Sequence, residues 1–360
     1  MFINHLAIKN FRNYVEADIH FVEGLNLLIG NNGSGKTNLL EAIHYISYGK
    51  PIRITKEADL VRFSANDFFL ETGFNRQDLD HQIRIYYSPD QKRYQYDGVE
   101  LSKKSALIGQ LVVVPFSPED ADVIRGGAAQ RRRAMDIILC SSNQQYLKNL
   151  KWYNKTLKQR NALLQDFHQG YHQEKELKQW DKILVDYGDY LMECRRKFTQ
   201  DIKQEILQIV GELNFPYKHL DLIYDPSVQP PLFSKTLESN FEKDISFGWT
   251  TSGPHRDDLK FILNHKPVAK FASRGQQRLI SLLFRLAEVE LYFKQVYEYP
   301  VIIIDEAFIE LDNQSVDLIV DKLLSYPQII LASADPEVIN HRKVNRKFKI
   351  GQGSVEKIKI

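Results

Sequence analysis

The sequence predicts an α/β fold in which one domain is split along the chain by a helical insertion. Two observations predict the α/β domain: a glycine-rich segment at 30–37 lies between a strand pattern and a helix pattern, and a run of branched residues at 301–304 ends in two acids. A third observation predicts the insertion, because residues 130–213 contain few glycines or prolines and repeat apolar side chains at helical spacing. We expect a discontinuous domain at 1–130 and 245–360, and a helical arm domain of short antiparallel helices at 131–244.

The glycine-rich segment matches the phosphate-binding loop pattern G-x-x-x-x-G-K-[ST] without departure. The apolar run at 25–29 predicts a strand before it, and residues 37–48 predict a helix after it, closed by Gly49. Glycines let backbone N–H groups approach phosphates, and the helix N-terminus adds partial positive charge. We expect Lys36 to reach the β- and γ-phosphates and Thr37 to bind Mg²⁺. The predicted loop residues are Gly30, Asn31, Asn32, Gly33, Ser34, Gly35, Lys36 and Thr37.

Strand patterns dominate the rest of the first 120 residues. Residues 2–8 and 15–21 predict two strands around a turn at 10–13. Further strands are predicted at 68–74, 82–88, 92–97 and 112–116. In the insertion, apolar side chains recur at spacings of three, four and seven, which predicts amphipathic helices whose apolar faces form a core. A helix over 174–213 would span about 60 Å at 1.5 Å per residue.

The α/β pattern resumes from about residue 249. Strands are predicted at 259–263, 301–304, 328–331 and 346–350, and helices at 277–297 and 314–325. Because a buried strand ending in a carboxylate is a Mg²⁺-binding pattern, we expect Asp305 to hold Mg²⁺ through water. Glu306 would then orient and deprotonate the attacking water. Together with the phosphate loop, this acidic pair indicates that the protein hydrolyses a nucleoside triphosphate rather than only binding it.

A Ser-x-Gly-Gln segment precedes the predicted helix 277–297, and Ser273 is a good helix N-cap. The chain order of phosphate loop, helical insertion, Ser-x-Gly-Gln, Asp-Glu strand and Leu-Asp turn is the order of the ABC-type ATPase heads. In these heads the Ser-Gly-Gln segment of one subunit closes on the γ-phosphate held by the other. One copy of each element therefore implies a homodimer with two composite sites. The further residues expected at the nucleotide are Ser273, Arg274, Gly275, Gln276 and Asp312.

Over nearly its whole length the chain resembles the RecF family of bacterial DNA replication, recombination and repair proteins. The motifs that carry the resemblance are 6–14, 30–37, 116–120 with Gly126 and Arg131-Arg132, 252–258, 273–276, and 304–306 with 310–312. The resemblance implies an ABC-type P-loop ATPase head related to structural-maintenance-of-chromosomes proteins, without long coiled coils. It also implies a weak ATPase that uses ATP and Mg²⁺, dimerises with ATP and binds DNA, either duplex or single/double-strand junctions. Such proteins work with RecR and RecO to help load RecA at gaps, and support replication restart and the SOS response.

Two places depart from the ABC pattern. Many ABC proteins have a glutamine after the strand that here ends at Phe116, whereas residues 117–120 read Ser-Pro-Glu-Asp, so the Mg²⁺-sensing role is unassigned. After the strand 328–331 many have a histidine, whereas this chain has Ser333 and Asp335. Either side chain could contact the γ-phosphate, and a plain turn is the favoured interpretation.

Three other groups of residues are open to more than one interpretation. Arg53 could contact the nucleotide or lie in a solvated loop. Residues 255–258 are expected to organise the Ser273 segment rather than to bind a metal. The ten histidines show no ligand spacing along the chain.

The chain has 48 Lys and Arg and 46 Asp and Glu, so it carries almost no net charge. Any DNA-binding surface must therefore be a local basic patch. No base-reading motif is present, so contact with phosphates, weakened by salt, is expected. The candidate cations are Lys103, Lys104, Arg125, Arg131, Arg132, Arg133, Arg342, Lys343, Arg346 and Lys347.

Two features of the sequence predict a cytoplasmic protein without a membrane span. The N-terminus lacks the apolar segment of a signal peptide, and no run of about 18 apolar residues occurs. The two cysteines, Cys140 and Cys194, lack metal-type spacing and are expected to be free thiols. The alternative functions are an ABC-type transport ATPase subunit, which the large insertion and basic tail disfavour, and a small-molecule kinase, in which the Ser273 segment would have no task.

Overall fold

The computed structural model describes residues 1–51, 56–168, 174–217, 219–334, 339 and 342–358. The chain forms two compact units. One, here called the split unit, combines Met1–Asp120 with Arg278–Ile360, and the other, here called the inserted unit, is Ala121–Gln277. No helix among the described residues is long and apolar enough to cross a lipid bilayer.

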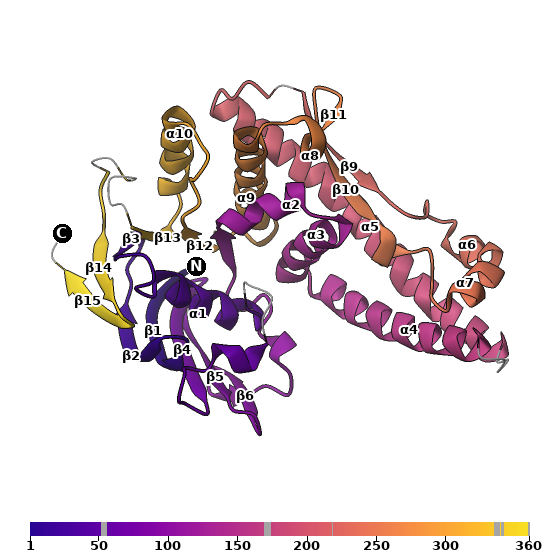
Figure 1. The fold of residues 1–360 in the computed structure, drawn as a ribbon, viewed down its shortest axis with the longest axis horizontal. Coiled ribbons are helices and arrows are strands. Elements are labelled where there is room, and N and C mark those ends of the chain that lie inside the picture. Colours follow the sequence, from indigo (N-terminus) through magenta and orange to yellow (C-terminus); the bar gives the residue numbers. More distant parts are fainter. Residues whose placement is uncertain (52–55, 169–173, 218, 335–338, 340–341, 359–360) are drawn as a thin grey trace. The chain divides into compact units, whose positions relative to one another are not determined.

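A mostly parallel six-stranded sheet forms the centre of the split unit, in the order β15-β14-β3-β13-β12-β8. Its strands are β3 (Gly24–Ile29), β8 (Val113–Phe116), β12 (Val301–Asp305), β13 (Gln328–Ser333), β14 (Arg346–Gly351) and β15 (Ser354–Ile358). All neighbours are parallel except β15, which pairs antiparallel with β14. Buried side chains run almost without a break along β3, β12 and β13, as expected for strands covered on both faces. Figure 1 shows β14 and β15 beside β3, although they come from opposite ends of the chain.

An antiparallel sheet of six strands forms the second layer of the split unit, in the order β2-β1-β4-β5-β6-β7. These strands are β1 (Phe2–Phe11), β2 (Tyr14–His20), β4 (Phe68–Arg76), β5 (Leu79–Tyr87), β6 (Lys92–Tyr96) and β7 (Val99–Glu100). Alternate side chains on β4 are buried, so one face of this sheet joins the core and the other meets solvent. Gln328 ties the two sheets together, because its amide accepts a hydrogen bond from Ile3 N at 2.8 Å and donates one to Ile3 O at 2.7 Å.

Helices complete the split unit. α1 (Lys36–Tyr48) begins after Gly35 and ends at Gly49, whose φ of 62° allows its N–H to bond back to Tyr45 O, so the predicted closure is confirmed. α9 (Arg274–Val296) and α10 (Asn313–Leu324) flank β12 in the sequence. Short 3₁₀ turns are η1 (Glu57–Leu60), η2 (Lys104–Ala106) and η3 (Pro118–Ala121). One apolar core joins both sheets to α1.

The inserted unit consists of helices and a three-stranded sheet. Its helices are α2 (Asp122–Arg125), α3 (Ala128–Ser142), α4 (Gln144–His168), α5 (Glu174–Glu212), α6 (Phe233–Ser239), α7 (Phe241–Phe247), η4 (Pro254–Arg256) and α8 (Val268–Phe271). The sheet has the order β11-β10-β9, with β9 (Leu220–Asp225), β10 (Asp258–Leu263) and β11 (Lys266–Pro267). α5 has 39 residues and so extends for about 58 Å, close to the single helix predicted at 174–213.

The inserted unit begins before and ends after the arm predicted at 131–244. The physical reason lies in strand pairing. β10 was predicted as a strand of the discontinuous domain, but it pairs antiparallel with β9, which the sequence analysis missed. This pairing places residues 258–263 in the inserted unit, so the division of the chain follows the sheet rather than the end of the helical segment.

A buried arginine organises the inserted unit. The Arg195 guanidinium, 2% exposed, donates to Asp136 Oδ1 at 2.9 Å, to Asp257 Oδ2 at 3.2 Å and to Pro254 O at 2.6 Å. Asp257 is itself fully buried and also accepts from the Ser227 backbone N–H at 2.9 Å. These bonds link α5 to α3, to η4 and to the segment after β9.

Candidate nucleotide-binding site

The register of the parallel sheet brings four strand ends into one row. Ser333 is opposite Ile29, Asp305 is opposite Ala332, and Ile304 is opposite Phe116. The carboxyl ends of parallel strands form one edge, which is where open α/β sheets bind ligands. The phosphate loop, the Asp305-Glu306 pair and the two segments that depart from the ABC pattern therefore meet at a single edge.

The glycines of the phosphate loop adopt conformations that side chains would oppose. Gly33 and Gly35 have φ of 79° and 114°, in the region that favours glycine. A Cβ on Gly30 would lie 2.3 Å from Ile350 O, and one on Gly35 would lie 2.7 Å from Asn13 Nδ2. The hydroxyl of Ser34 is buried and has no hydrogen-bond partner among the described residues. The Ser34 hydroxyl could donate to a phosphate oxygen, and the close contacts at Gly30 and Gly35 keep side chains out of the loop. Both features are those of a phosphate-binding loop.

The turn between β1 and β2 supports the phosphate loop from outside. The Tyr14 hydroxyl donates to Gly35 O at 2.9 Å, and Asn13 Nδ2 donates to Ser34 O at 3.3 Å. Arg12 forms a two-point ion pair with Glu41 of α1, at 2.8 and 3.0 Å. The motif at 6–14 thus has a structural task, which is to hold the loop and the first turns of the helix behind it.

Lys36 is folded back onto its own loop. Its ammonium group donates to Gly30 O at 2.7 Å and to Asn31 O at 3.1 Å. Burial lowers the pKa of Lys36, while the nearby charges of Glu306 and Asp305 act in the opposite direction. A bound anion would interact with this buried ammonium group more strongly than the two neutral carbonyl groups do.

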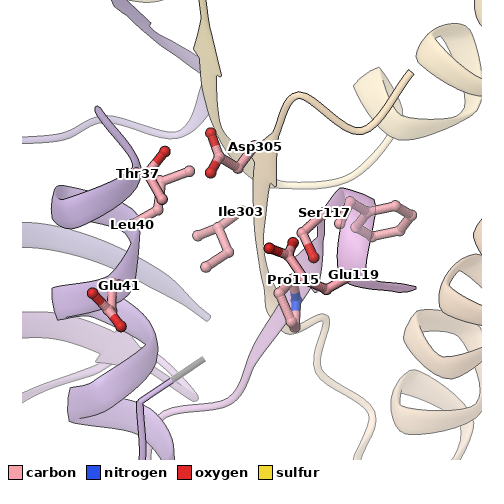
Figure 2. A pocket seen from close by; sticks show the side chains of 9 residues that line it. Thr37, Leu40, Glu41, Pro115, Ser117, Glu119, Ile303 and Asp305 are labelled. Carbon is pink, nitrogen blue, oxygen red and sulfur yellow. The ribbon is translucent and has the colours of Figure 1, made fainter. Parts of the chain in front are cut away.

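Thr37 and Asp305 line one small pocket of about 20 Å³, with α1 on one side and the end of β8 on the other. Figure 2 shows their oxygen atoms facing each other. Ser117 and Glu119, from the segment after β8, line the same pocket. Oxygen donors in a space of this size fit Mg²⁺, which prefers hydroxyl, carboxylate and water ligands. The sequence analysis left the segment 117–120 without a role, and the structure places it at this pocket.

Glu306 follows β12 directly and is exposed, with a φ of 47°. Left-handed backbone at a non-glycine residue is uncommon and recurs at functional sites, where it aims a side chain. Glu306 lines a cleft of about 720 Å³ together with Asn32 of the phosphate loop and Ser333. The acid predicted as the base therefore faces open space beside the loop.

Asp312 is the N-cap of α10. Its carboxylate accepts from Ser315 N at 2.9 Å and from Ser315 Oγ at 2.8 Å, and these bonds lower its pKa. Its neighbours Leu311 and Asn313 line the cleft beside Glu306. The side chain predicted to bind nucleotide is thus engaged in a helix cap.

The Ser273 segment forms a reciprocal cap at the start of α9. The Gln276 side chain accepts from Ser273 N at 2.9 Å, and the Ser273 hydroxyl accepts from Gln276 N at 3.2 Å. The predicted N-cap is confirmed. Ser273 and Arg274 are exposed, and Gly275 is half-buried. The end of the helix that was predicted to meet a γ-phosphate is therefore open to solvent in this chain.

The predicted DNA-contacting cations differ in their availability. Arg131 forms a two-point ion pair with Asp258, at 2.6 and 2.9 Å, and Arg132 donates to Asp257 O at 2.6 Å. Arg342 pairs with Asp317 and Asp321, at 3.0 and 2.8 Å. The exposed members of the predicted set are Lys103, Arg125, Arg133 and Lys343.

The residues at 255–258 hold the inserted unit together. The His255 ring contacts the Tyr153 hydroxyl at 2.7 Å and Thr250 O at 3.0 Å, and burial lowers its pKa to about 4. Both ring nitrogens make hydrogen bonds within the inserted unit. The hydrogen-bond partners of residues 255–258 lie on α3, α4, α5 and β9 among others. Arg53 and Asp335 lie outside the described residues.

The whole chain has known relatives. It matches the family described as RecF/RecN/SMC N terminal domain over residues 2–356. It is 33% identical over 359 residues to the DNA replication and repair protein RecF of Lachnoclostridium phytofermentans, covering 99% of this chain and 100% of the relative. The chain belongs to the RecF family. The protein of the same description from Lactococcus lactis subsp. cremoris strain MG1363 is 32% identical over 360 residues, covering 100% of both chains.

Solved structures agree with this RecF assignment. A structure described as the recombination mediator protein RecF-ATP in the RecFOR pathway aligns with a TM-score of 0.92 at 28% identity, covering 99% of this chain and 98% of that one. The Smc head domain of Pyrococcus furiosus aligns with a TM-score of 0.57 at 17% identity, which supports the fold alone. The predicted α/β fold, an ABC-type ATPase head related to the SMC proteins, is confirmed. The family assignment also selects DNA replication and repair over transport and small-molecule kinase chemistry.

Proposed function

We propose that this RecF-family chain is an ATP-dependent DNA-binding protein of recombinational repair, in which ATP joins two copies on DNA and slow hydrolysis releases them. The observation that carries the proposal is the shared edge of the sheet. There the phosphate loop, the pocket of Thr37 and Asp305, and the exposed Glu306 lie beside one another. The relative whose solved structure is described with ATP supports ATP as the nucleotide.

Each residue at the edge has a proposed task. The backbone N–H groups of 30–37 and the Lys36 ammonium bind the β- and γ-phosphates. Thr37 and Asp305 would hold Mg²⁺, which neutralises charge on the phosphates when bound. Glu306 accepts a proton from the attacking water as that water adds to the γ-phosphorus, while the bond from the γ-phosphorus to the bridging oxygen breaks and that oxygen leaves with ADP. The residues of this chain therefore provide binding, orientation and a base in one site.

The proposed dimer rests on the exposed start of α9. Ser273 and Arg274 face solvent, and the N-terminus of this helix carries partial positive charge suited to an anion. We propose that residues 273–276 of one copy cap the γ-phosphate held by the other, as in ABC-type heads. The RecFOR pathway named for the relative supports RecR and RecO as partners in loading RecA at DNA gaps.

The function is tested by the dependence of DNA affinity on ATP. Wild-type protein is expected to bind a gapped duplex at least about tenfold tighter with ATP than without, because closure adds the phosphate contacts of a second copy. Lys36→Ala is expected to lose this difference, since the phosphate loop loses its cation. Fluorescence anisotropy at two salt concentrations measures both effects. Lys349→Ala, which removes an exposed cation of β14, is the matched control and should behave as wild type. If the DNA affinity of wild-type protein is the same with and without ATP, the proposal is wrong.

Ser273→Arg is expected to leave ATP binding unchanged and to prevent ATP-dependent dimerisation. The larger cationic side chain would occupy the space in which the cap meets phosphate, and loss of the hydroxyl that accepts from Gln276 N should cost only about 1 kcal/mol of stability. Equilibrium binding of a fluorescent ATP analogue and light scattering measure the two properties separately. Ser239→Arg, at the exposed end of α6, is the control and should still dimerise. Loss of ATP binding in Ser273→Arg would instead make the segment a structural element.

A further inference from the structure

We propose that the hairpin of β1 and β2 carries a binding site for a divalent transition metal of the Zn²⁺ class, formed by His5, Asp18 and His20. This site is separate from the nucleotide edge and does not depend on the proposed function. One nitrogen of each ring and one carboxylate oxygen lie within 4.8 Å of one another. The histidines show no ligand spacing in the sequence, so strand pairing is what assembles the group.

The register of the hairpin creates the cluster. His5 pairs with His20 across the two strands, and Asp18 pairs with Ala7, one step further along the same face. Side chains at alternate positions of a strand point to the same side of the sheet, so all three project from the solvent-facing side. Their exposed fractions, 23% for His5, 67% for Asp18 and 71% for His20, leave room for an ion and its water.

The distances match a tetrahedral metal centre. His5 Nε2 lies 3.1 Å from Asp18 Oδ1, and His20 Nε2 lies 3.4 Å from the same oxygen. Ligand atoms about 2.0–2.1 Å from a tetrahedral Zn²⁺ are separated by about 3.3–3.4 Å. The distance from His20 Nε2 to Asp18 Oδ1 already has this length, and the distance from His5 Nε2 is slightly shorter. Rotation of the exposed His20 ring and of the half-buried His5 ring, whose centroids are 5.0 Å apart, would bring the second nitrogen into place.

The backbone beneath the ligands is fixed on both sides. His5 O accepts from the Thr72 hydroxyl at 2.9 Å, and His20 O accepts from Arg346 Nη1 at 2.6 Å. These bonds tie β1 to β4 and the end of β2 to β14. The backbone that carries the proposed metal ligands is therefore fixed in position. A site on strands is more rigid than one on a loop, which lowers the entropy lost when the ion binds.

The donor set selects the kind of metal. Two imidazole nitrogens and one carboxylate oxygen suit Zn²⁺, Co²⁺, Ni²⁺ or Cu²⁺, whereas Mg²⁺ and Ca²⁺ prefer oxygen ligands alone. Three protein ligands leave a fourth position for water or for a ligand from another molecule. An ion there would bridge β2, the edge strand of its sheet, to β1 and so hold the edge of the sheet in place.

Zn²⁺ titration of the full-length protein without nucleotide tests the site. Competition with a chromophoric chelator is expected to give a binding step in wild type that is at least about tenfold weaker in His20→Ala and in Asp18→Asn. The matched control is His219→Ala, which removes one ring of the stacked pair His219 and His265, 6.4 Å apart, and should keep the wild-type affinity. Unchanged affinity in both ligand variants overturns the proposal.

A second readout locates the ion directly. Substoichiometric Zn²⁺ is expected to shift the imidazole NMR signals of His5 and His20 before those of other histidines, and Co²⁺ to give the intense visible absorption of a tetrahedral centre. Zn²⁺ should also raise the melting temperature of wild type and not that of His20→Ala, since an ion that binds only the folded state stabilises it. Equal melting shifts in both proteins, or first shifts at other rings, would show that the metal binds elsewhere.

Discussion

Replacing Glu306 with glutamine is expected to lower the rate of ATP hydrolysis by about 10²–10⁴-fold while leaving ATP binding intact. Glutamine keeps the size and the polar end of the side chain but cannot accept the proton of the attacking water. The side chain is exposed and lines an open cleft, so the substitution should cost little packing. Lys36, Thr37 and Asp305, which are proposed to hold the triphosphate, remain unchanged. The variant should therefore accumulate in the ATP-bound state.

The accumulation can be measured by gel filtration with light scattering at saturating ATP. Glu306→Gln is expected to run as a stable dimer, and wild type as a mixture that returns to monomer as ATP is consumed. Glu356→Gln, an exposed acid on β15, is the matched control and should hydrolyse at the wild-type rate. A Glu306→Gln protein that stays monomeric with ATP bound would count against nucleotide-driven closure, and one that hydrolyses at full rate would count against Glu306 as the base.

Replacing Arg195 with alanine is expected to destabilise the inserted unit by about 3–5 kcal/mol. The substitution leaves the fully buried Asp257 without its cationic partner, and removes the donors that link Asp136 and Pro254 O to α5. An unpaired buried carboxylate costs far more than the loss of one surface ion pair, because it must either stay charged in an apolar setting or take up a proton.

Tryptophan fluorescence isolates this effect, because Trp152, Trp180 and Trp249 all lie in the inserted unit. Thermal unfolding followed by this signal should occur about 6–20 °C lower in Arg195→Ala than in wild type. Arg196→Ala is the matched control one residue away, since its exposed ion pair with Glu193 should contribute little. Equal melting temperatures in the two variants would show that the buried network does not hold the unit.

The sequence was most informative where chemistry is local. The phosphate loop, its flanking strand and helix, and the Ser273 cap depend on residues within a few positions of one another, so their pattern alone predicts them. The strand that ends at Asp305 could be predicted for the same reason, since a short run of branched residues before acids has few other interpretations. The roles of these residues at the nucleotide stay predictions until the variants above are measured.

Features that depend on distant pairing were missed. β9 was overlooked because prolines surround it, and the pairing of β10 with β9 was not predicted because nothing near β10 in the sequence reveals its partner strand. Glu119 had no role until the parallel register placed the end of β8 beside Asp305. The predicted turn at 10–13 would place His5 opposite Asp18, whereas the observed pairing of Phe11 with Tyr14 places it opposite His20, so the cluster depends on the exact register of the hairpin.

Arg278 links the nucleotide edge to the interior. Its guanidinium is buried and donates to Ala307 O at 2.8 Å and to Ser117 O at 2.7 Å. Ala307 follows Glu306, and Ser117 lines the pocket that contains Thr37 and Asp305, so one side chain holds both segments from the interior. Ser273 directly precedes Arg274, the first residue of the helix that carries Arg278. A displacement of Arg278 would therefore move both segments together rather than one at a time.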